Sequence, residues 1–229
     1  MSKMASHASH NSQLVSIPLV LVASIAFGSG ASVNVTRGHL AYRTTSGEQM
    51  TLAKGMHVGS ATLSENETLV AFTRVLKPET ETREGRSELW ICNVHTGRMW
   101  RLLRSEGSPD PNRNLSWLDH PEFSLHDKSV YINAIAWIDE DAVHNVKLET
   151  GAERFIVDGD LEAIIRSGPY AGDLLVRRHT LLPGGVGFYY PAYLVRPSGQ
   201  ILFRIPNQTV KTGFGVVRQW LRKNGWIAS

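Results

Sequence analysis

Apolar and polar residues alternate along most of the chain, in short runs that are joined by turns containing glycine. Four segments share one design, an alternating run, a turn with glycine and a second alternating run: 40–52, 89–103, 143–157 and 193–205. A period of two predicts half-buried antiparallel strands, and glycine supplies the positive φ that a tight hairpin needs. The four turn glycines are Gly47, Gly97, Gly151 and Gly199, at spacings of 50, 54 and 48 residues.

A further shared hairpin precedes these segments. Residues 62–72 and 122–132 both contain an apolar residue followed by a serine, then a polar turn and an alternating strand. Residues 163–181 have the same order of strand, turn and strand with a different turn. Each repeat is therefore about four short strands in roughly 50 residues, the size of one β-propeller blade. A β-sandwich also has frequent turns, but it does not predict one turn at near-constant spacing. The pattern favours an all-β protein, a small β-propeller of about four blades that are four-stranded antiparallel sheets.

The C-terminus bears on whether the ring of blades closes. Residues 220–229 fit the same register as 123–132, whereas the first repeat has only its second hairpin. We therefore expect the N- and C-terminal strands to pair, which would complete the first blade and leave no sheet face bare. The alternative is that residues 216–224 form a short helix.

The first 31 residues have the organisation of a leader. A polar start with Lys3 is followed by an apolar run over 14–27 and by small residues over 28–31. This order predicts a secretory signal peptide over 1–31, a propeller domain over 32–229 and a periplasmic or secreted protein. The apolar run is interrupted by Pro18 and is shorter than the roughly 20 residues that span a bilayer, so the mature protein is not expected to span a membrane.

Composition and charge narrow the class of protein. The chain is 42% hydrophobic and 20% charged, which fits one soluble domain with its own core. The formal net charge is +3 without a basic run, so we expect no nucleic-acid partner. The single cysteine, Cys92, forms no intramolecular disulfide, and its place in an alternating run predicts a buried, inert thiol.

Motifs for catalysis and cofactors are missing from the sequence. There is no Gly-x-Ser-x-Gly elbow, no Gly-rich phosphate loop and no Cys-x-x-Cys pair. We therefore expect no catalytic residue, no cofactor and no metal. Four acidic or histidine motifs remain, and all are interpreted as turn residues whose side chains satisfy backbone amides: Asp119-His120, His126-Asp127, Asp139-Glu140-Asp141 and Asp158-Gly159-Asp160.

One aromatic cluster is the candidate binding surface: Phe188, Tyr189, Tyr190 and Tyr193. Tyrosine combines apolar area with a polar tip, and it recurs at recognition surfaces. On an alternating strand, the first and third of these residues share one face and the second points the opposite way. Packing between blades is the favoured role, and surface binding is the alternative. His179, next to two arginines, is expected to face solvent.

Several motifs resemble the TolB-type, WD-repeat-like propeller repeats of exported bacterial proteins. They are Phe123-Ser124 with Asp127-Lys128, Glu88-Leu89-Trp90-Ile91, Thr96-Gly97 and Thr150-Gly151. The resemblance covers about residues 36–206, and its repeats are degenerate because Pro-Asp-Gly is absent. It implies a six-bladed ring, often beside another domain. This chain has room for neither, so it is not expected to be TolB itself.

The sequence thus predicts an exported, non-enzymatic β-propeller that acts as a protein- or ligand-binding module in the cell envelope, with an envelope protein or a glycan as partner. The alternative is a degenerate propeller enzyme, a hydrolase or lyase acting on carbohydrate or peptide. Acidic and histidine side chains that converge at the centre would favour the enzyme. An apolar centre with aromatic side chains outside would favour the binding module. An unpaired terminal strand would suggest a half-ring that closes by dimerisation, and the oligomeric state is left open.

Overall fold

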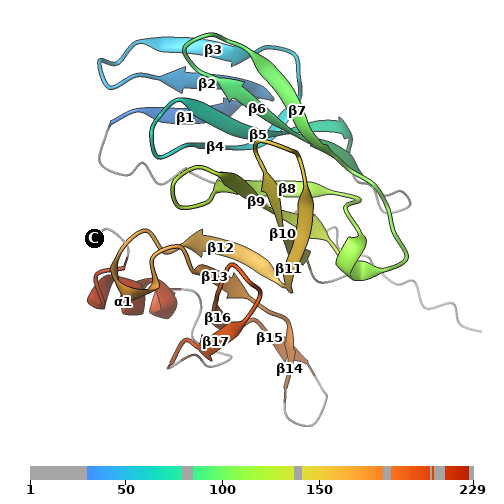
Figure 1. Cartoon of the computed structure of the whole chain (residues 1–229), viewed down its shortest axis with the longest axis vertical. Coiled ribbons are helices and arrows are strands. Elements are labelled where there is room, and N and C mark those ends of the chain that lie inside the picture. Colours follow the sequence, from blue (N-terminus) through green and yellow to red (C-terminus); the bar gives the residue numbers. More distant parts are fainter. Residues whose placement is uncertain are drawn as a thin grey trace, which may run out of the picture.

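The protein is built from small antiparallel sheets that follow one another along the chain. The computed structural model describes residues 30–78, 85–136, 141–182, 187–206, 208 and 215–226. Figure 1 shows the sheets in succession, from the blue N-terminal part to the orange and red C-terminal part. The first strand of each sheet lies against the first strand of the next, so the sheets are arranged around a common line rather than in two layers.

Within each sheet the strands pair in chain order. The first sheet comprises β1 (Ser32–Thr36), β2 (His39–Arg43) and β3 (Gln49–Ala53). The second comprises β4 (Val58–Leu63), β5 (Leu69–Lys77), β6 (Arg86–Asn93) and β7 (Met99–Arg104). The third comprises β8 (Leu118–Phe123), β9 (Ser129–Ile135), β10 (Asp141–Lys147) and β11 (Glu153–Asp158). The fourth comprises β12 (Asp160–Ile164), β13 (Leu174–Arg177), β16 (Ala192–Val195) and β17 (Ile201–Arg204).

Three further kinds of element complete the fold. A two-stranded ribbon, β14 (Thr180–Leu181) and β15 (Phe188–Tyr189), is inserted between the second and third strands of the fourth sheet. Two short 3-10 turns occur at Pro111–Arg113 and Gly168–Tyr170, and one α-helix, α1, spans Gly215–Lys223. Among the described residues, no helix is long and apolar enough to cross a bilayer.

The repeat that the sequence predicts is confirmed at its turns. Gly47, Gly97, Gly151 and Gly199 each lie between the last two strands of their sheet, with φ between 68° and 91°. The serines of the other hairpin are also equivalent. The hydroxyl oxygen of Ser64 accepts the Leu69 N–H at 2.9 Å, and the hydroxyl oxygen of Ser124 accepts the Ser129 N–H at 3.0 Å. The same chemistry therefore closes the first turn of the second and third sheets.

Two of the turn glycines provide a matched test of this arrangement. A Cβ at Gly97 would meet nothing within 4 Å, whereas a Cβ at Gly199 would collide with the backbone carbonyl of Ile156 in the third sheet. We expect Gly97→Ala to cost about 1 kcal/mol, for the positive φ alone. Gly199→Ala should cost at least about 2 kcal/mol more, because the third and fourth sheets must also separate. Urea denaturation of the two variants measures the difference, and equal costs would contradict the packing of these sheets.

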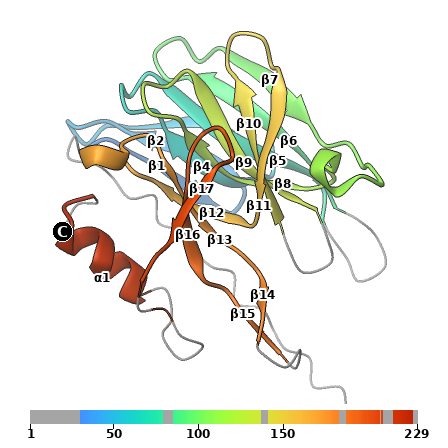
Figure 2. The ribbon, with the colours of Figure 1, turned by 60° about the horizontal axis from the view of Figure 1, so that its bottom comes forward.

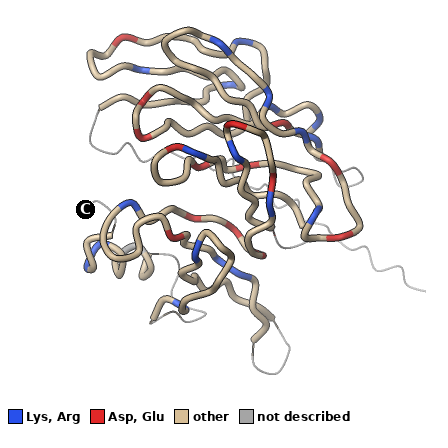
Figure 3. Tube along the Cα trace, viewed as in Figure 1, with Lys and Arg blue, Asp and Glu red and all other residues tan. Residues whose placement is uncertain are grey.

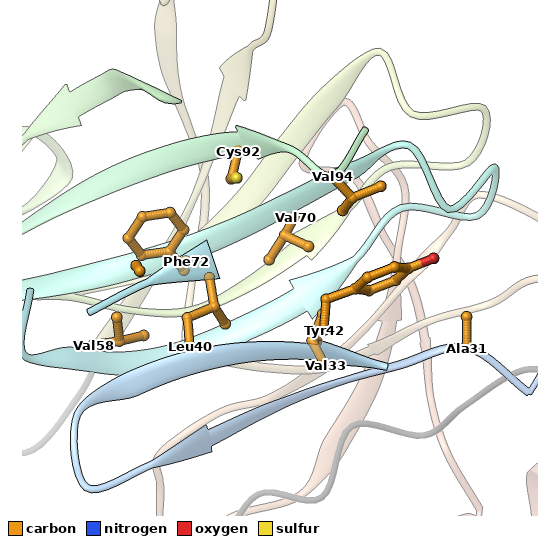
Figure 4. Close-up of a cluster of buried hydrophobic side chains, with 10 residues drawn as sticks. Ala31, Val33, Leu40, Tyr42, Val58, Val70, Phe72, Cys92 and Val94 are labelled. Atoms are coloured by element: carbon orange, nitrogen blue, oxygen red, sulfur yellow. The ribbon is translucent and has the colours of Figure 1, made fainter. Parts of the chain in front are cut away.

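Apolar clusters between neighbouring sheets hold the fold together. Figure 4 shows the first cluster, in which Leu40 and Tyr42 of the first sheet face Val70, Phe72 and Cys92 of the second. Equivalent clusters lie between the second and third sheets and between the third and fourth. Each sheet is too thin to bury a core alone, so its stability depends on its neighbours. The prediction of a buried thiol is confirmed, and burial raises the pKa of Cys92.

The prediction that C-terminal strands complete the first blade is wrong. Residues 215–223 form α1, which was the alternative. Val217 and Leu221 lie four residues apart on one face of the helix, and this face covers the outward side of the fourth sheet. The helix ends in a Schellman motif, in which the Gly225 N–H donates to Arg222 O at 2.9 Å and the Trp226 N–H donates to Leu221 O at 3.0 Å.

The two ends of the array are therefore finished in different ways. At one end, α1 covers the apolar outer face of the fourth sheet. At the other end, the first sheet turns a polar face outward, which includes Asn34, Thr36, His39 and Arg43. In the part of the chain that the structure describes, no strand joins the first sheet to the fourth. The four sheets form an open arc whose terminal faces need no ring closure.

Candidate functional site

The first strands of three successive sheets are all interrupted by a β-bulge. The register shifts between Val58 and Ala61 in β4, within residues 119–122 of β8, and between Leu161 and Ala163 in β12. A bulge leaves a residue out of the ladder and redirects its side chain. The residues within these bulges include Ser60, His120 and Glu162, and His120 has a φ of 49°. Polar side chains are thereby brought together where the second, third and fourth sheets meet.

Asp119 lies at the centre of this meeting point. Its Oδ1 accepts the Ser60 hydroxyl at 2.5 Å, and its Oδ2 lies 3.2 Å from His120 Nδ1. The Ser60 oxygen also accepts the His120 N–H at 3.1 Å. Burial opposes ionisation of Asp119, but the hydrogen bonds of His120 and Ser60 outweigh it and lower the pKa of this carboxyl. The hydrogen bond to Asp119 in turn raises the pKa of His120, so these two residues form an ion pair within β8, and the hydrogen bonds of Ser60 link this pair to β4.

Two more carboxyl groups join Asp119 from the third and fourth sheets. Asp141 is the first residue of β10 and Asp160 is the first residue of β12, and their side chains are hydrogen-bonded to each other. Burial and the negative charges of Asp160 and Asp119 raise the pKa of Asp141 to about 7. Near pH 7 Asp141 is therefore protonated in about half of the molecules and, when protonated, is hydrogen-bonded to Asp160. We call Asp119, His120, Asp141 and Asp160 the carboxylate cluster.

Arg177, the last residue of β13, connects the carboxylate cluster to the aromatic residues. Its Nη2 lies 3.2 Å from Asp160 Oδ2, and its Nε lies 2.7 Å from Glu162 Oε1. The guanidinium carbon is 5.6 Å from the centre of the Tyr190 ring, a cation–π distance. One arginine thus forms ion pairs with two carboxylates and contacts one aromatic ring.

The candidate binding surface divides into exposed and buried parts. The Phe188 and Tyr190 rings lie 5.5 Å apart and contact His179 at 4.5 and 5.5 Å, and their exposed fractions are 49% and 39%. Tyr189 points the opposite way, as alternation predicts, and its hydroxyl accepts Arg204 Nη1 at 3.0 Å. Tyr193 packs against the core between the third and fourth sheets. Core packing therefore describes Tyr193, whereas two of the four residues face solvent.

Leu181 extends this exposed group along the ribbon. It pairs directly with Phe188 across β14 and β15, and 64% of it is exposed. His179, which was expected to face solvent, is instead half-buried against the Phe188 and Tyr190 rings. We call His179, Leu181, Phe188 and Tyr190 the aromatic face.

The acidic motifs that the sequence places in turns have different environments. Asp119-His120 lies in a bulged strand rather than a turn, and Asp141 and Asp160 stand at strand ends beside it. Residues 139 and 140 lie outside the described residues. His126-Asp127 is in a turn, where the Asp127 carboxylate accepts the Glu65 N–H at 3.1 Å. Over the described ranges, no three such side chains are arranged to hold a metal ion.

Comparison with known proteins bears on the fold. No family model and no curated protein matches the sequence. The chain is similar to dipeptidyl peptidase 4 from Porphyromonas gingivalis, with 9% identity over 78% of this chain and 31% of that chain and a TM-score of 0.52. It is also similar to TolB from Acinetobacter baumannii, with 14% identity over 79% of this chain and 42% of that chain and a TM-score of 0.46. A third similar structure is the β-propeller domain of the trilobed protease from Pyrococcus furiosus, with 9% identity over 78% of this chain and 53% of that chain and a TM-score of 0.45.

The chain spans between about a third and about a half of these solved chains. Identities this low describe the fold and leave the activity open. The successive antiparallel sheets, three of them four-stranded, and the similarity to the Porphyromonas gingivalis chain show a β-propeller fold, here with an open arc. The resemblance that the repeats predict is confirmed at the level of the fold.

Proposed function

We propose that the chain is a non-enzymatic β-propeller binding module, exported to the cell envelope, that recognises an envelope protein or a glycan through the aromatic face. The observation that carries this proposal is the exposure of Leu181, Phe188 and Tyr190 on a ribbon that projects from the fourth sheet (Figure 2). Grouped aromatic side chains with polar neighbours are typical of recognition surfaces. The leader over 1–31, which is outside the described residues apart from its last two positions, supports export.

The root of the ribbon is held rigidly. Gln208 accepts the Ala192 N–H at 2.7 Å and donates to Ala192 O at 2.9 Å and to Ile205 O at 2.7 Å. Arg204 donates to Gln208 O at 2.7 Å as well as to the Tyr189 hydroxyl. A surface that is ordered before binding loses less conformational entropy when a partner arrives. The ribbon is therefore suited to present side chains rather than to fold around a ligand.

Affinity capture tests this function. The mature protein, immobilised and exposed to envelope extract and to a panel of oligosaccharides, should retain a specific partner. Phe188→Ser with Tyr190→Ser should reduce retention about tenfold or more, because aromatic anchors dominate such interfaces. Met50→Ser, which removes an equally exposed apolar side chain from the first sheet, should not reduce it. Equal retention by all three proteins would contradict recognition by the aromatic face.

The carboxylate cluster supports the second candidate, a hydrolase or lyase acting on carbohydrate or peptide. A carboxyl group with a pKa near 7 beside ionised carboxylates is the arrangement that general acid and base catalysis uses. Against this role, Asp119 and Asp160 are already bound to Ser60, His120 and Arg177. Turnover of an oligosaccharide or peptide that is lost in Asp141→Asn would favour the enzyme over the binding module.

A further inference from the structure

The near-neutral net charge hides a strong asymmetry along the chain. Residues 174–229 contain eight Lys or Arg residues and no Asp or Glu. Residues 1–173 contain sixteen Lys or Arg residues and twenty-one Asp or Glu residues. Figure 3 shows this as blue segments without red on β13, β16, β17 and α1. Because the basic residues are spread over several elements, they form no run in the sequence. Those on β13, β16, β17 and α1 lie at the fourth-sheet end of the arc.

Part of this positive charge is neutralised and part is not. Arg177 and Arg178 form ion pairs with acidic residues at the start of β12 and the end of β11. Four other basic side chains are exposed and, within the described residues, take part in no salt bridge. They are Arg196, Arg204, Arg222 and Lys223, and we call them the basic face. The uncompensated charge is thus carried by β16–β17 and α1.

The basic face adjoins the ribbon that carries the aromatic face. Arg204 reaches the ribbon directly through its 3.0 Å hydrogen bond to the Tyr189 hydroxyl. Its neighbour in β17, Phe203, contacts Trp220 of α1, with ring centres 6.2 Å apart. The ribbon and α1 therefore both contact β17, the ribbon through the face that bears Arg204 and α1 through the opposite face that bears Phe203. Figures 1 and 2 both show the ribbon and α1 at the fourth-sheet end of the molecule.

The chemistry of this region combines exposed apolar side chains with cations. Leu181 and Phe188 project from the ribbon, Tyr190 adds an amphipathic ring, Arg204 contacts the base of the ribbon, and the other three cations lie at the far end of β16 and at the end of α1. Aromatic side chains with polar edges prefer the interface of a bilayer, and each Lys or Arg near an anionic leaflet adds to the attraction. Helix α1 contributes charge only, because its apolar side is buried on the fourth sheet.

We propose that the fourth-sheet end of the molecule docks on an anionic lipid surface. Leu181 and Phe188 enter the headgroup region, and the basic face binds lipid phosphates. This inference goes beyond the proposed function, since it gives the same aromatic face a lipid partner in place of a protein or a glycan. A nucleic acid fits less well, because the His179, Phe188 and Tyr190 rings meet one another at angles of 39° to 80° and one face of Tyr190 is covered by Arg177. Base stacking needs free ring faces.

Co-sedimentation with vesicles tests this docking. The mature protein should bind vesicles of equimolar phosphatidylglycerol and phosphatidylcholine, should not bind vesicles of phosphatidylcholine alone, and should dissociate as salt is raised. Arg222→Gln with Lys223→Gln should weaken binding about 25-fold, since each charge contributes on the order of a fivefold effect. Leu181→Ser with Phe188→Ser should weaken it at least as much. Lys54→Gln with Arg98→Gln, which removes the same charge from exposed sites on the first two sheets, should leave it unchanged.

The outcomes separate this inference from the proposed function. Equal binding to both kinds of vesicle, or equal loss in the control and in Arg222→Gln with Lys223→Gln, overturns the lipid docking. Binding of a single-stranded oligonucleotide in the absence of vesicle binding overturns it in favour of a nucleic acid. Capture of an envelope protein that requires Phe188 and Tyr190, without any vesicle binding, preserves the proposed function and removes the lipid partner.

Discussion

Asp141→Asn is expected to stabilise the protein at pH 8 and to stabilise it by only about a third as much at pH 5. In the folded state the pKa of Asp141 is raised from 3.8 to about 7. At pH 5 the folded protein keeps this proton, whereas at pH 8 the side chain is ionised next to Asp160 and Asp119. Stability contributed by this group is therefore lost as pH rises from about 4 to about 7. Asparagine retains a donor for Asp160 and carries no charge.

The full pKa shift corresponds to about 4 kcal/mol, and solvent screening of this partly exposed group reduces the expected gain to about 2 kcal/mol at pH 8. In a domain of this size the gain raises the melting temperature by about 5 °C. Thermal unfolding at both pH values measures it, with Glu149→Gln on the exposed β10–β11 turn as the control for loss of one negative charge. A destabilised Asp141→Asn at pH 8 would show that the pKa of Asp141 is not raised in the folded protein.

The pKa shifts of Asp141, His120, Asp119 and Glu88 together predict that the whole protein is most stable in mild acid. The pKa of His120 is raised by its hydrogen bond to Asp119, so its contribution is present below the unfolded pKa of about 6.5 and is lost as pH rises through the folded pKa. The pKa of Asp119 and of Glu88 is lowered, so their contributions are lost only as the carboxyl groups become protonated in stronger acid. The loss on the alkaline side therefore begins before neutral pH.

Leu221→Ala is expected to have the largest effect of any single truncation in α1. Leu221 is 1% exposed and packs with Val217 and Trp226 on the outward face of the fourth sheet. Truncation should cost about 3 kcal/mol through lost burial and the cavity left behind. Because α1 is the cover of the last sheet, the variant should also expose apolar surface and aggregate on mild heating. Urea denaturation and light scattering measure the two effects.

Arg222→Ala serves as the matched control, because Arg222 is adjacent in the same helix and its side chain is exposed. It should change the free energy of unfolding by less than about 0.5 kcal/mol. If Leu221→Ala and Arg222→Ala cost the same, α1 does not cover the sheet and the account of how the arc ends is wrong.

Local chemistry explains why the hairpins could be predicted from the sequence. The conformation of a hairpin turn depends on residues within the turn itself, such as a glycine with positive φ or a serine that accepts a backbone N–H. Gly97 and Ser124 are examples, and equivalent residues have the same role in other repeats. The first strand of the chain, β1, was missed because it has no preceding hairpin to mark it. Residues 220–229 were predicted to be strands because they match residues 123–132 at a few apolar positions. A match this short does not distinguish a strand from a helix. The four-residue spacing of Val217 and Leu221 is the pattern in the sequence that indicates a helix here.

The site was harder to predict because it depends on contacts between sheets. Asp119, Asp141 and Asp160 are far apart in the sequence, and each alone looks like a turn residue. Pro121 within a strand does indicate a bulge, and Gly59 in β4 gives the same indication. Neither shows that the bulges of separate sheets lie side by side. The exposure of Phe188 and Tyr190 was the alternative to packing between blades, because alternation identifies a face but not whether another sheet covers it.

A distance between the two ends of the array tests the open arc most directly. In a Cys92→Ser background, one spin label would replace Ser46, in the outer turn of the first sheet, and a second would replace Lys223 in α1; both sites are exposed. Three sheet-to-sheet spacings of about 10 Å separate these ends, so pulsed electron resonance should give a distance longer than about 25 Å. It should also exceed the distance between labels at Ser46 and His95, which lie in neighbouring sheets. A distance shorter than about 15 Å between Ser46 and Lys223 would place the first and fourth sheets side by side in a closed ring.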